Sequence, residues 1–196
     1  MLKNIIEILL YPILEVFYSF CLKKKKQRTL SALSADVQIY KELHNLCDED
    51  YINRVIFCCL TNGGAIILPT KIKFNFIIEE VKSKSIKYNV EKYQKQIIDT
   101  ALLERIINSI YSDNHVSKIN IKDYPEGNIR NTFFNQEVEE SLVAYIACDQ
   151  QHLWYILINS KKEIDITNKL LLRLIYSATN TIANTLEKHY KLEHRI

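Results

Sequence analysis

SLVAYIAC-DQQ-HLWYILIN, residues 141–159, consists of two apolar runs separated by Asp149-Gln150-Gln151. Both runs are rich in aromatic and β-branched side chains, which favour extended backbone. Two runs of this kind joined by three polar residues predict a β-hairpin, with strands at Ser141–Cys148 and His152–Asn159 and a three-residue loop. The chain is therefore expected to contain at least one antiparallel strand pair.

Three further strands are indicated upstream of the hairpin. The apolar run Tyr51–Leu60 is typical of a strand buried on both faces, and Asn62-Gly63-Gly64 follows it with residues suited to a turn. In the stretch 72–79, apolar and polar residues alternate, which predicts a strand with one buried face. We expect these two strands to pair. His115–Ile121 is predicted to be a short strand.

Helical spacing of apolar residues predicts three helices, over Thr29–Asp48, over Lys92–Tyr111, and from a cap at Asp165 or Thr167 to about Tyr190. The apolar stripe expected on the first comprises Leu30, Leu33, Val37, Tyr40, His44 and Cys47. The stripe expected on the last comprises Leu171, Ile175, Ala178, Ile182 and Leu186. We expect these two stripes either to pack on the domain's own sheet or to support self-association, and we favour self-association.

The order of these elements predicts an α+β domain with an antiparallel sheet of about five to six strands and flanking helices on one side. Tyr124–Asn128 contains Pro and Gly and is expected to be a turn, whereas Ile129–Asn135 is too short to assign. The domain is expected to occupy residues 29–196.

Residues 1–28 have a different composition. Asn4–Leu22 is a mostly apolar stretch, and it is followed by the basic residues Lys23, Lys24, Lys25, Lys26 and Arg28. This arrangement predicts a membrane anchor with a basic stop at the membrane surface, and hence a single-pass membrane protein with its main domain in the cytoplasm. Because Glu7 and Glu15 offset the contribution of the apolar residues, a helix lying in the membrane interface and a buried helix of the domain stay open as alternatives.

The formal net charge of +3 is local to this segment. Residues 1–28 carry six Lys/Arg and two Glu, and the rest of the chain holds twenty basic and twenty-one acidic residues. The main domain therefore lacks the basic face that nucleic-acid binding requires. We expect no nucleic-acid partner.

No catalytic or metal-binding motif is evident, and no cofactor is expected. The five cysteines form no C-x-x-C pair, and Cys58 and Cys59 are expected to be buried in a strand. Cys148, Asp149 and His152 form the one Cys/Asp/His cluster, which is interpreted as a buried thiol followed by a polar turn, with an enzyme using Cys148 as a weaker alternative.

The order of elements and the flanking helices resemble a GAF domain, a sensor fold related to PAS. The stretch Tyr51–Ile56 through Asn62-Gly63-Gly64 is similar to GAF-like proteins encoded by bacteriophages. This resemblance implies that the segment before the hairpin covers a ligand pocket, where the polar candidates are Tyr124, Arg130 and Asn131. It also implies that the first and last helices pack together and form a dimer bundle.

The same resemblance disfavours two known ligands of the family. Asn168-Lys169 leads into three leucines and lacks the pattern of cyclic-nucleotide-binding members, and Cys148 is followed by Asp149 and not by the His often found in bilin-binding members. The sequence thus predicts a membrane-tethered, non-catalytic binding or regulatory module from a phage or mobile element. Its expected partners are the membrane, a second copy, another protein or a small molecule. A phage structural or lysis-associated protein that uses the fold as a scaffold is the alternative.

Overall fold

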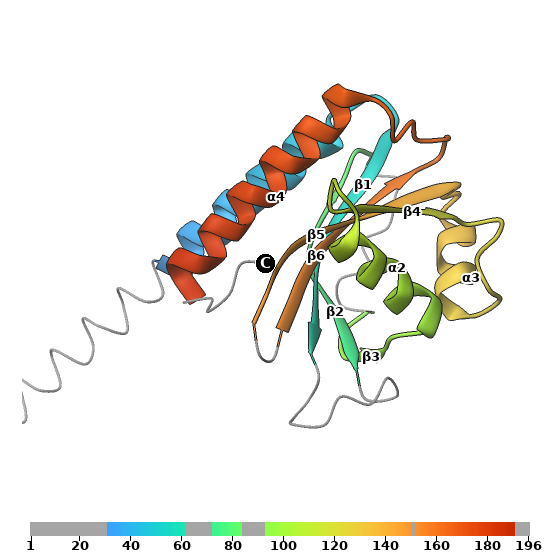
Figure 1. The fold of residues 1–196 in the computed structure, drawn as a ribbon, viewed down its shortest axis with the longest axis horizontal. Helices are drawn as coiled ribbons and strands as arrows, with labels where there is room; N and C mark the ends of the chain where they lie inside the picture. The colour runs from blue at the N-terminus through green and yellow to red at the C-terminus, as the bar shows by residue number, and fades with distance from the viewer. Residues whose placement is uncertain (1–30, 62–71, 84–92, 150–151, 191–196) are drawn as a thin grey trace, which may run out of the picture. The chain divides into compact units, whose positions relative to one another are not determined.

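The computed structural model describes residues 31–61, 72–83, 93–149 and 152–190. Residues 31–47 are helical. The elements that follow (Figure 1) are β1 (Ile52–Thr61), β2 (Lys73–Val81), β3 (Gln96–Ile97), α2 (Thr100–Tyr111), β4 (Val116–Asn120), α3 (Asn128–Asn135), β5 (Glu140–Cys148), β6 (His152–Ser160) and α4 (Lys169–Tyr190). The chain divides into two compact units, Met1–Val37 and Gln38–Ile196, and the fold below is that of the second unit. The predicted boundary between residues 28 and 29 stays a prediction.

The strands form one six-stranded sheet in the order β3-β2-β1-β6-β5-β4. Every neighbouring pair is antiparallel. The predicted hairpin is the β5–β6 pair, in which Tyr145 lies opposite Tyr155 and Cys148 opposite Leu153. The predicted pairing of the two upstream strands is the β1–β2 ladder. The α+β class and the strand number are therefore confirmed.

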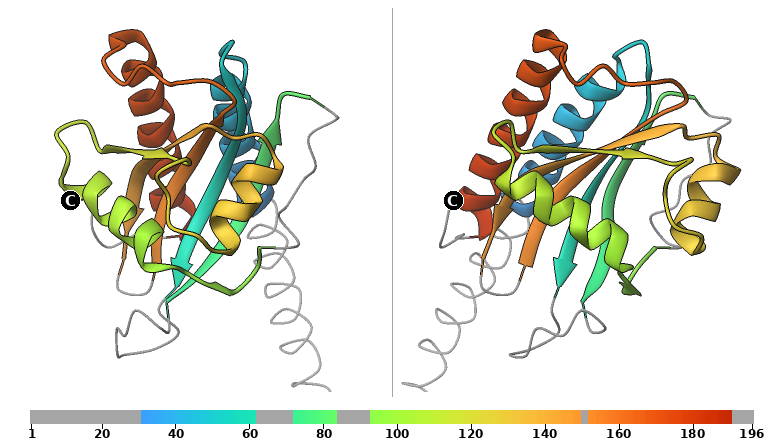
Figure 2. Two further views of the ribbon diagram at one scale, coloured as in Figure 1. Left: turned by 90° about the vertical axis from the view of Figure 1, so that its right-hand side faces the viewer. Right: turned by 45° about the vertical axis from the view of Figure 1, so that its right-hand side comes forward.

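Helices cover both faces of the sheet, so the expectation of helices on one side is wrong (Figures 1 and 2). We call the two faces the α4 face and the α2 face. On the α4 face, residues of the helix segment 38–47 and of α4 form one core cluster with the strands. On the α2 face, α2, α3 and the segment between β4 and α3 form a second cluster.

The reason for two covering layers is the composition of the central strands. In β1, Val55, Phe57 and Cys59 belong to the cluster on the α4 face. The residues between and beyond them, Ile56, Cys58 and Leu60, belong to the cluster on the α2 face. Because successive side chains of a strand point to opposite faces, a continuous apolar run requires cover on both sides.

The cysteines of β1 are buried as predicted. Cys58 is 0 % and Cys59 5 % exposed. Burial raises the pKa of Cys58 well above its usual range and that of Cys59 to about 12. Both thiols therefore stay protonated at neutral pH and pack as small apolar groups.

The helix predicted over Lys92–Tyr111 begins later, at Thr100. Asp99 caps it, since Asp99 Oδ1 accepts a hydrogen bond from Leu102 N at 2.7 Å. Upstream of this cap, Lys95 adopts a left-handed φ of 56°, and Gln96–Ile97 forms β3, which pairs with β2. Ile97 has helical spacing relative to Ala101 by coincidence, because it lies in a strand and is 62 % exposed.

The last helix also has a different cap from the one expected. Asn168 Oδ1 accepts hydrogen bonds from Leu170 N at 2.9 Å and Leu171 N at 3.3 Å. Asp165 instead accepts from Thr167 N at 2.8 Å in the preceding turn. The stripe predicted for this helix is buried throughout on the α4 face: Leu171, Ile175, Ala178, Ile182 and Leu186.

Within residues 38–47, Cys47 is the one residue of the predicted stripe that lies on the packing face of the first helix. Within residues 38–47, the buried positions are Ile39, Leu43, Leu46 and Cys47, and Tyr40 is 46 % exposed. His44, also in the predicted stripe, places Nδ1 3.0 Å from Glu80 Oε1 on β2. This contact with the Glu80 carboxylate raises the pKa of His44.

The sequence predicts a single-pass membrane protein, and the structure does not support this localisation. Among the residues that the structure describes, no helix is both long enough and apolar enough to cross a bilayer. The 22-residue helix α4 carries charges such as Arg173 and Glu187, and its apolar stripe packs on the sheet. The stretch for which the anchor was predicted, with Lys23, Lys24, Lys25, Lys26 and Arg28, lies outside the described residues, as does Asn62-Gly63-Gly64.

One ion pair lies inside the domain. Arg54 Nε on β1 is 2.8 Å from Glu79 Oε1 on β2, and their side chains are 3 % and 0 % exposed. Burial lowers the pKa of Arg54, and the neighbouring Glu79 carboxylate opposes that effect. Because two desolvated charges compensate each other here, loss of either charge leaves the other buried without its counter-ion.

We predict that Glu79→Gln lowers the free energy of unfolding by about 3–5 kcal/mol, because it removes the counter-ion of a buried arginine. Urea denaturation of the full chain measures this value. The matched control is Glu137→Gln, which neutralises the exposed pair with Lys161 and should change stability by less than about 1 kcal/mol. Equal effects of the two substitutions would contradict the prediction.

Candidate functional site

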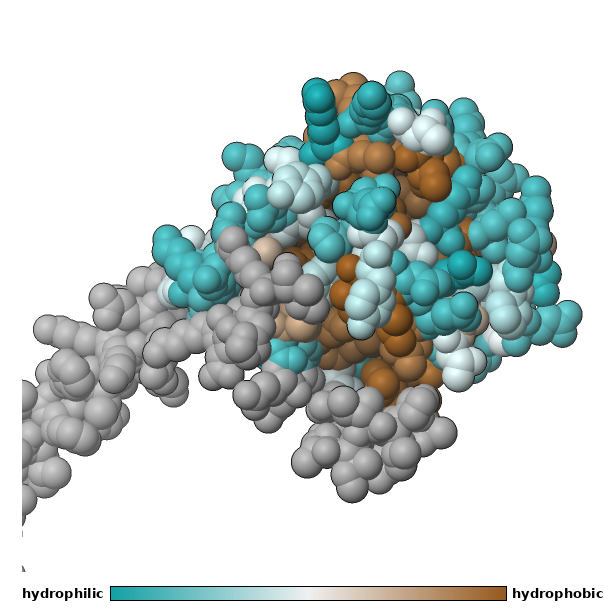
Figure 3. All heavy atoms as spheres, in the orientation of Figure 1, coloured by the Kyte–Doolittle hydropathy of each residue, from teal (hydrophilic) through white to brown (hydrophobic). Residues whose placement is uncertain are grey.

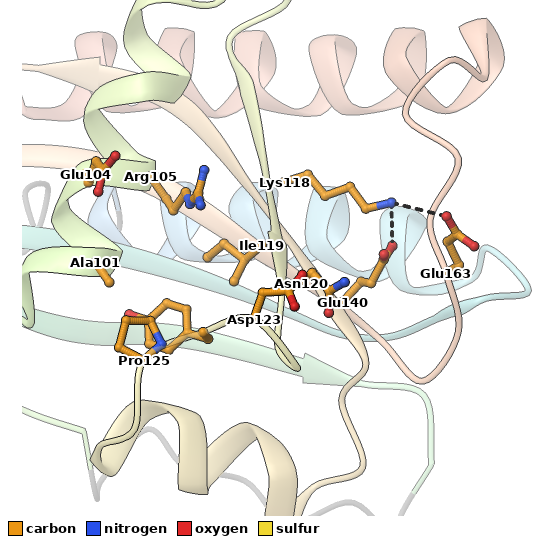
Figure 4. A pocket seen from close by; sticks show the side chains of 11 residues that line it. Ala101, Glu104, Arg105, Lys118, Ile119, Asn120, Asp123, Pro125, Glu140 and Glu163 are labelled. Atoms are coloured by element: carbon orange, nitrogen blue, oxygen red, sulfur yellow. Dashed lines mark ion pairs between the residues drawn. The ribbon is translucent and has the colours of Figure 1, made fainter.

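A groove of about 540 Å³ lies beside the edge strand β4. We call it the β4 groove. Its walls come from α2, β4, the loop after β4, β5 and the loop after β6 (Figure 4). The lining residues are Ala101, Glu104, Arg105, Lys118, Ile119, Asn120, Asp123, Tyr124, Pro125, Glu140 and Glu163.

Lys118 is the centre of the ionic contacts in this groove. Its Nζ lies 2.8 Å from Glu140 Oε2 and 3.7 Å from Glu163 Oε1, and it donates to the Ile164 carbonyl oxygen at 3.0 Å. Glu140 Oε2 also accepts from Ile164 N at 2.6 Å. These bonds connect the loop after β6 to β4 and β5 and fix one wall of the groove (Figure 4).

Tyr124 forms part of the opposite wall. It is 5 % exposed, and its hydroxyl donates to Asp99 Oδ1 at 2.5 Å. Burial raises the pKa of Tyr124, and the Asp99 carboxylate adds to the effect. Since the same oxygen of Asp99 also caps α2, this one carboxylate connects α2 to the loop that contains Tyr124.

The charges that line the groove are unequal in number. Glu104, Asp123, Glu140 and Glu163 are acidic, whereas Arg105 and Lys118 are basic. Lys118 is already paired with two of the carboxylates. A groove with this balance favours ligands that carry positive charge.

The interior beneath α3 is nearly full. A cavity of about 20 Å³ remains there, with Phe74, Phe76, Tyr93, Leu102, Ile129, Thr132, Phe133 and Leu157 around it. The Phe76 and Tyr93 rings lie 5.0 Å apart between centroids, and the Tyr93 hydroxyl forms a hydrogen bond with Thr132. Aromatic side chains therefore occupy the space that α3 covers.

The three residues predicted to bind a ligand occupy different places. Tyr124 lines the β4 groove. Arg130 and Asn131 lie on α3 and do not line the β4 groove. Arg130 Nη1 is 3.8 Å from Glu126 Oε1, and its Nη2 donates to the Lys122 carbonyl oxygen at 3.3 Å. Their role in binding stays a prediction.

The three residues of the Cys/Asp/His cluster do not contact one another as a group. Asp149 pairs with His152, whereas Cys148 pairs with Tyr145. Asp149 Oδ1 accepts from His152 N at 2.7 Å and lies 3.2 Å from His152 Nδ1, so these residues close the hairpin. The Cys148 thiol interacts with the Tyr145 hydroxyl. Among the described residues, no three His, Cys, Asp or Glu side chains lie close enough together to hold a metal ion.

We predict that Asp99→Ala lowers the free energy of unfolding by about 2–4 kcal/mol, because it removes both a helix cap and the acceptor of a buried hydroxyl. We also predict the result of a double-mutant cycle with Tyr124→Phe. The sum of the stability losses in the two single variants should exceed the stability loss in the double variant. The control is Asp165→Ala in an exposed turn, for which we expect about 0.5–1 kcal/mol. Additive losses in the cycle would show that the two residues are not coupled.

Comparison with known proteins identifies the fold through structure. The sequence matches no protein-family profile. It also matches no curated protein sequence. The chain is similar to the blue-light-absorbing form of the Thermosynechococcus elongatus PixJ GAF domain, with 12% identity and a TM-score of 0.56, over 82% of this chain and 89% of that one.

Two further solved structures have the same fold. The GAF domain of a two-component sensor histidine kinase from Bacillus halodurans has 14% identity and a TM-score of 0.56, over 80% of this chain and 95% of that one. The phycocyanobilin-bound GAF domain from a cyanobacterial phytochrome has 11% identity and a TM-score of 0.54, over 87% and 95%. The comparisons give no support to a phage origin. At these identities they establish the fold alone, which is GAF-like.

Proposed function

We propose that this chain is a non-catalytic regulatory module that binds a positively charged small molecule in the β4 groove. The observation that supports it is the groove itself, which is about 540 Å³ in volume and lined by four carboxylates and two basic side chains. This volume lies within the range of ligand sites, about 300–1,000 Å³.

The charges suggest which part of the groove receives the ligand. Lys118, Glu140 and Glu163 interact with one another at one wall. Glu104 and Asp123 are exposed and lie on the other walls, on α2 and on the loop after β4. An ammonium group between these two carboxylates would connect α2 to that loop, in addition to the existing bond between Tyr124 and Asp99.

A regulatory role agrees with the proteins that share the fold. One is a domain of a sensor histidine kinase and another holds phycocyanobilin. In the present chain, the space beneath α3 measures about 20 Å³ and is filled by the chain's own aromatic side chains. A small polar ligand in the outer groove is compatible with this packing, whereas a tetrapyrrole beneath α3 is not.

We predict that spermidine stabilises the full chain against thermal unfolding in a concentration-dependent manner, and that citrate does not. Asp123→Asn should weaken spermidine binding about tenfold in calorimetry, because it removes one charge-assisted contact. Glu126→Gln is the matched control: it removes a carboxylate from the same loop that does not line the groove, and affinity should be unchanged. Equal responses to citrate and spermidine, or equal loss in both variants, would refute the proposal.

A second candidate function is favoured by the filled interior and by the apolar surface. A domain without an internal ligand can act as a scaffold that binds another chain through its outer face. Figure 3 shows apolar atoms at the N-terminal end of α4, where Leu170 is 72 % exposed; Tyr176 on the same helix is 61 % exposed. The partner proposed for this surface is a second copy of the chain. The stripe of α4 that the sequence predicted for self-association is buried on the sheet, so this contact would use other residues of the helix.

For this second candidate, we predict that sedimentation of the full chain detects a dimer that Leu170→Glu dissociates, because the substitution places a charge in an apolar contact. Phe134→Glu is the control, since Phe134 is similarly exposed, at 62 %, but lies on α3. A chain that is monomeric at all concentrations, or a dimer that survives Leu170→Glu, would exclude α4 as the interface.

A further inference from the structure

A separate cavity of about 140 Å³ is lined by residues of α4, of the end of β5 and of the turn from α2 to β4. Its lining residues are His115, Tyr145, Ile146, Tyr176, Thr179, Asn180 and Ala183. It shares no residue with the β4 groove or with the space beneath α3.

The local course of the strands creates this cavity. β4 begins at Val116, which lies opposite Ala144, and Tyr145 N donates to the His115 carbonyl oxygen at 3.0 Å. Beyond that bond, β5 continues without β4 beside it. The register of β5 with β6 also shifts between Tyr145 and Ala147, and this irregularity brings both Tyr145 and Ile146 to the cavity wall.

Tyr145 is the unusual residue of this wall. Its side chain belongs to neither core cluster, although the residue is only 6 % exposed. Within the described residues its buried hydroxyl has no nitrogen or oxygen partner. The Cys148 thiol, a weak hydrogen-bonding group, is the side chain that interacts with it. A buried hydroxyl in this state costs free energy unless a ligand or water accepts a hydrogen bond from it.

The neighbouring polar groups have defined roles. His115 adopts a left-handed φ of 54°, and its Nδ1 lies 3.2 Å from the Ile110 carbonyl oxygen. A carbonyl oxygen only accepts hydrogen bonds, so Nδ1 carries the proton and Nε2 of the neutral ring is an acceptor. Asn180 on α4 adds an amide that both donates and accepts. Burial, together with Cys148, raises the pKa of Tyr145, so its hydroxyl stays a donor.

We propose that this cavity binds a neutral ring carboxamide or lactam. The Tyr145 hydroxyl donates to the carbonyl oxygen of the ligand, and His115 Nε2 accepts from its N–H. The ring lies against Ile146 and the two tyrosine rings. A cavity of about 150 Å³ is known to hold benzene, so a single six-membered ring is the appropriate size. No Lys, Arg, Asp or Glu is among the described lining residues, which disfavours a charged ligand.

Calorimetric titration of the full chain with nicotinamide tests the proposal, and nicotinate is the control ligand with the same ring and a negative charge. We expect nicotinamide to bind and nicotinate to bind at least tenfold more weakly. Tyr145→Phe should weaken nicotinamide binding about tenfold, because it removes one hydrogen bond. Asn180→Ala, an exposed substitution that does not endanger folding, should weaken it as well.

Tyr155→Phe is the matched control variant. Tyr155 is fully buried and its hydroxyl likewise has no nitrogen or oxygen partner in the described chain, but it does not line this cavity. Nicotinamide affinity should therefore be unchanged in this variant. Absence of nicotinamide binding, equal binding of nicotinate, or equal affinity of Tyr145→Phe and the unmodified chain would overturn the proposal. None of these results bears on spermidine binding in the β4 groove.

Discussion

The central strands β1, β6 and β5 are apolar on both faces, and this property constrains the rest of the fold. A sheet of this kind must be covered twice. The α4 face is covered by the segment 38–47 and the long helix α4. The α2 face is covered by shorter pieces: a twelve-residue helix, an eight-residue helix and the loop between β4 and α3. The β4 groove lies on the α2 face, where these short elements meet at the edge strand β4.

The parts of the fold that were predictable from sequence are those with long, unambiguous patterns. β1, the β5–β6 hairpin and α4 each have an extended apolar pattern with one period. β3 was missed because Ile97 also fits the helical spacing of α2. α3 could not be assigned because it has eight residues and buries a single side chain, Phe133. The packing face of residues 38–47 was misjudged because two apolar stripes of different phase run along that helix.

The candidate site was far less predictable than the fold. Tyr124 could be singled out because the GAF resemblance places the segment before the hairpin over a ligand pocket, and Tyr124 is one of the polar side chains in that segment. Glu104, Arg105 and Lys118 gave no signal, because charges on an amphipathic helix or an edge strand are typical of a solvated surface. They become one site only when α2 packs against β4. His115 and Tyr145 likewise lie far apart in the sequence and meet at the end of a strand ladder.

Three of the four buried tyrosines in the described part of the domain, Tyr124, Tyr145 and Tyr155, show how the same side chain acquires different roles. Tyr124 has a strong acceptor in Asp99, and its hydroxyl holds two elements together. Tyr155 interacts with the Cys58 thiol, and both residues are 0 % exposed in the core cluster of the α2 face. Tyr145 interacts with a thiol too, but it lies beside an open cavity. Burial raises the pKa of all three. Of these three, Tyr145 is the one whose hydroxyl can gain a hydrogen-bond partner from a molecule that enters the adjacent cavity. This difference supports a binding role for the end of β5 and a structural role for Tyr155.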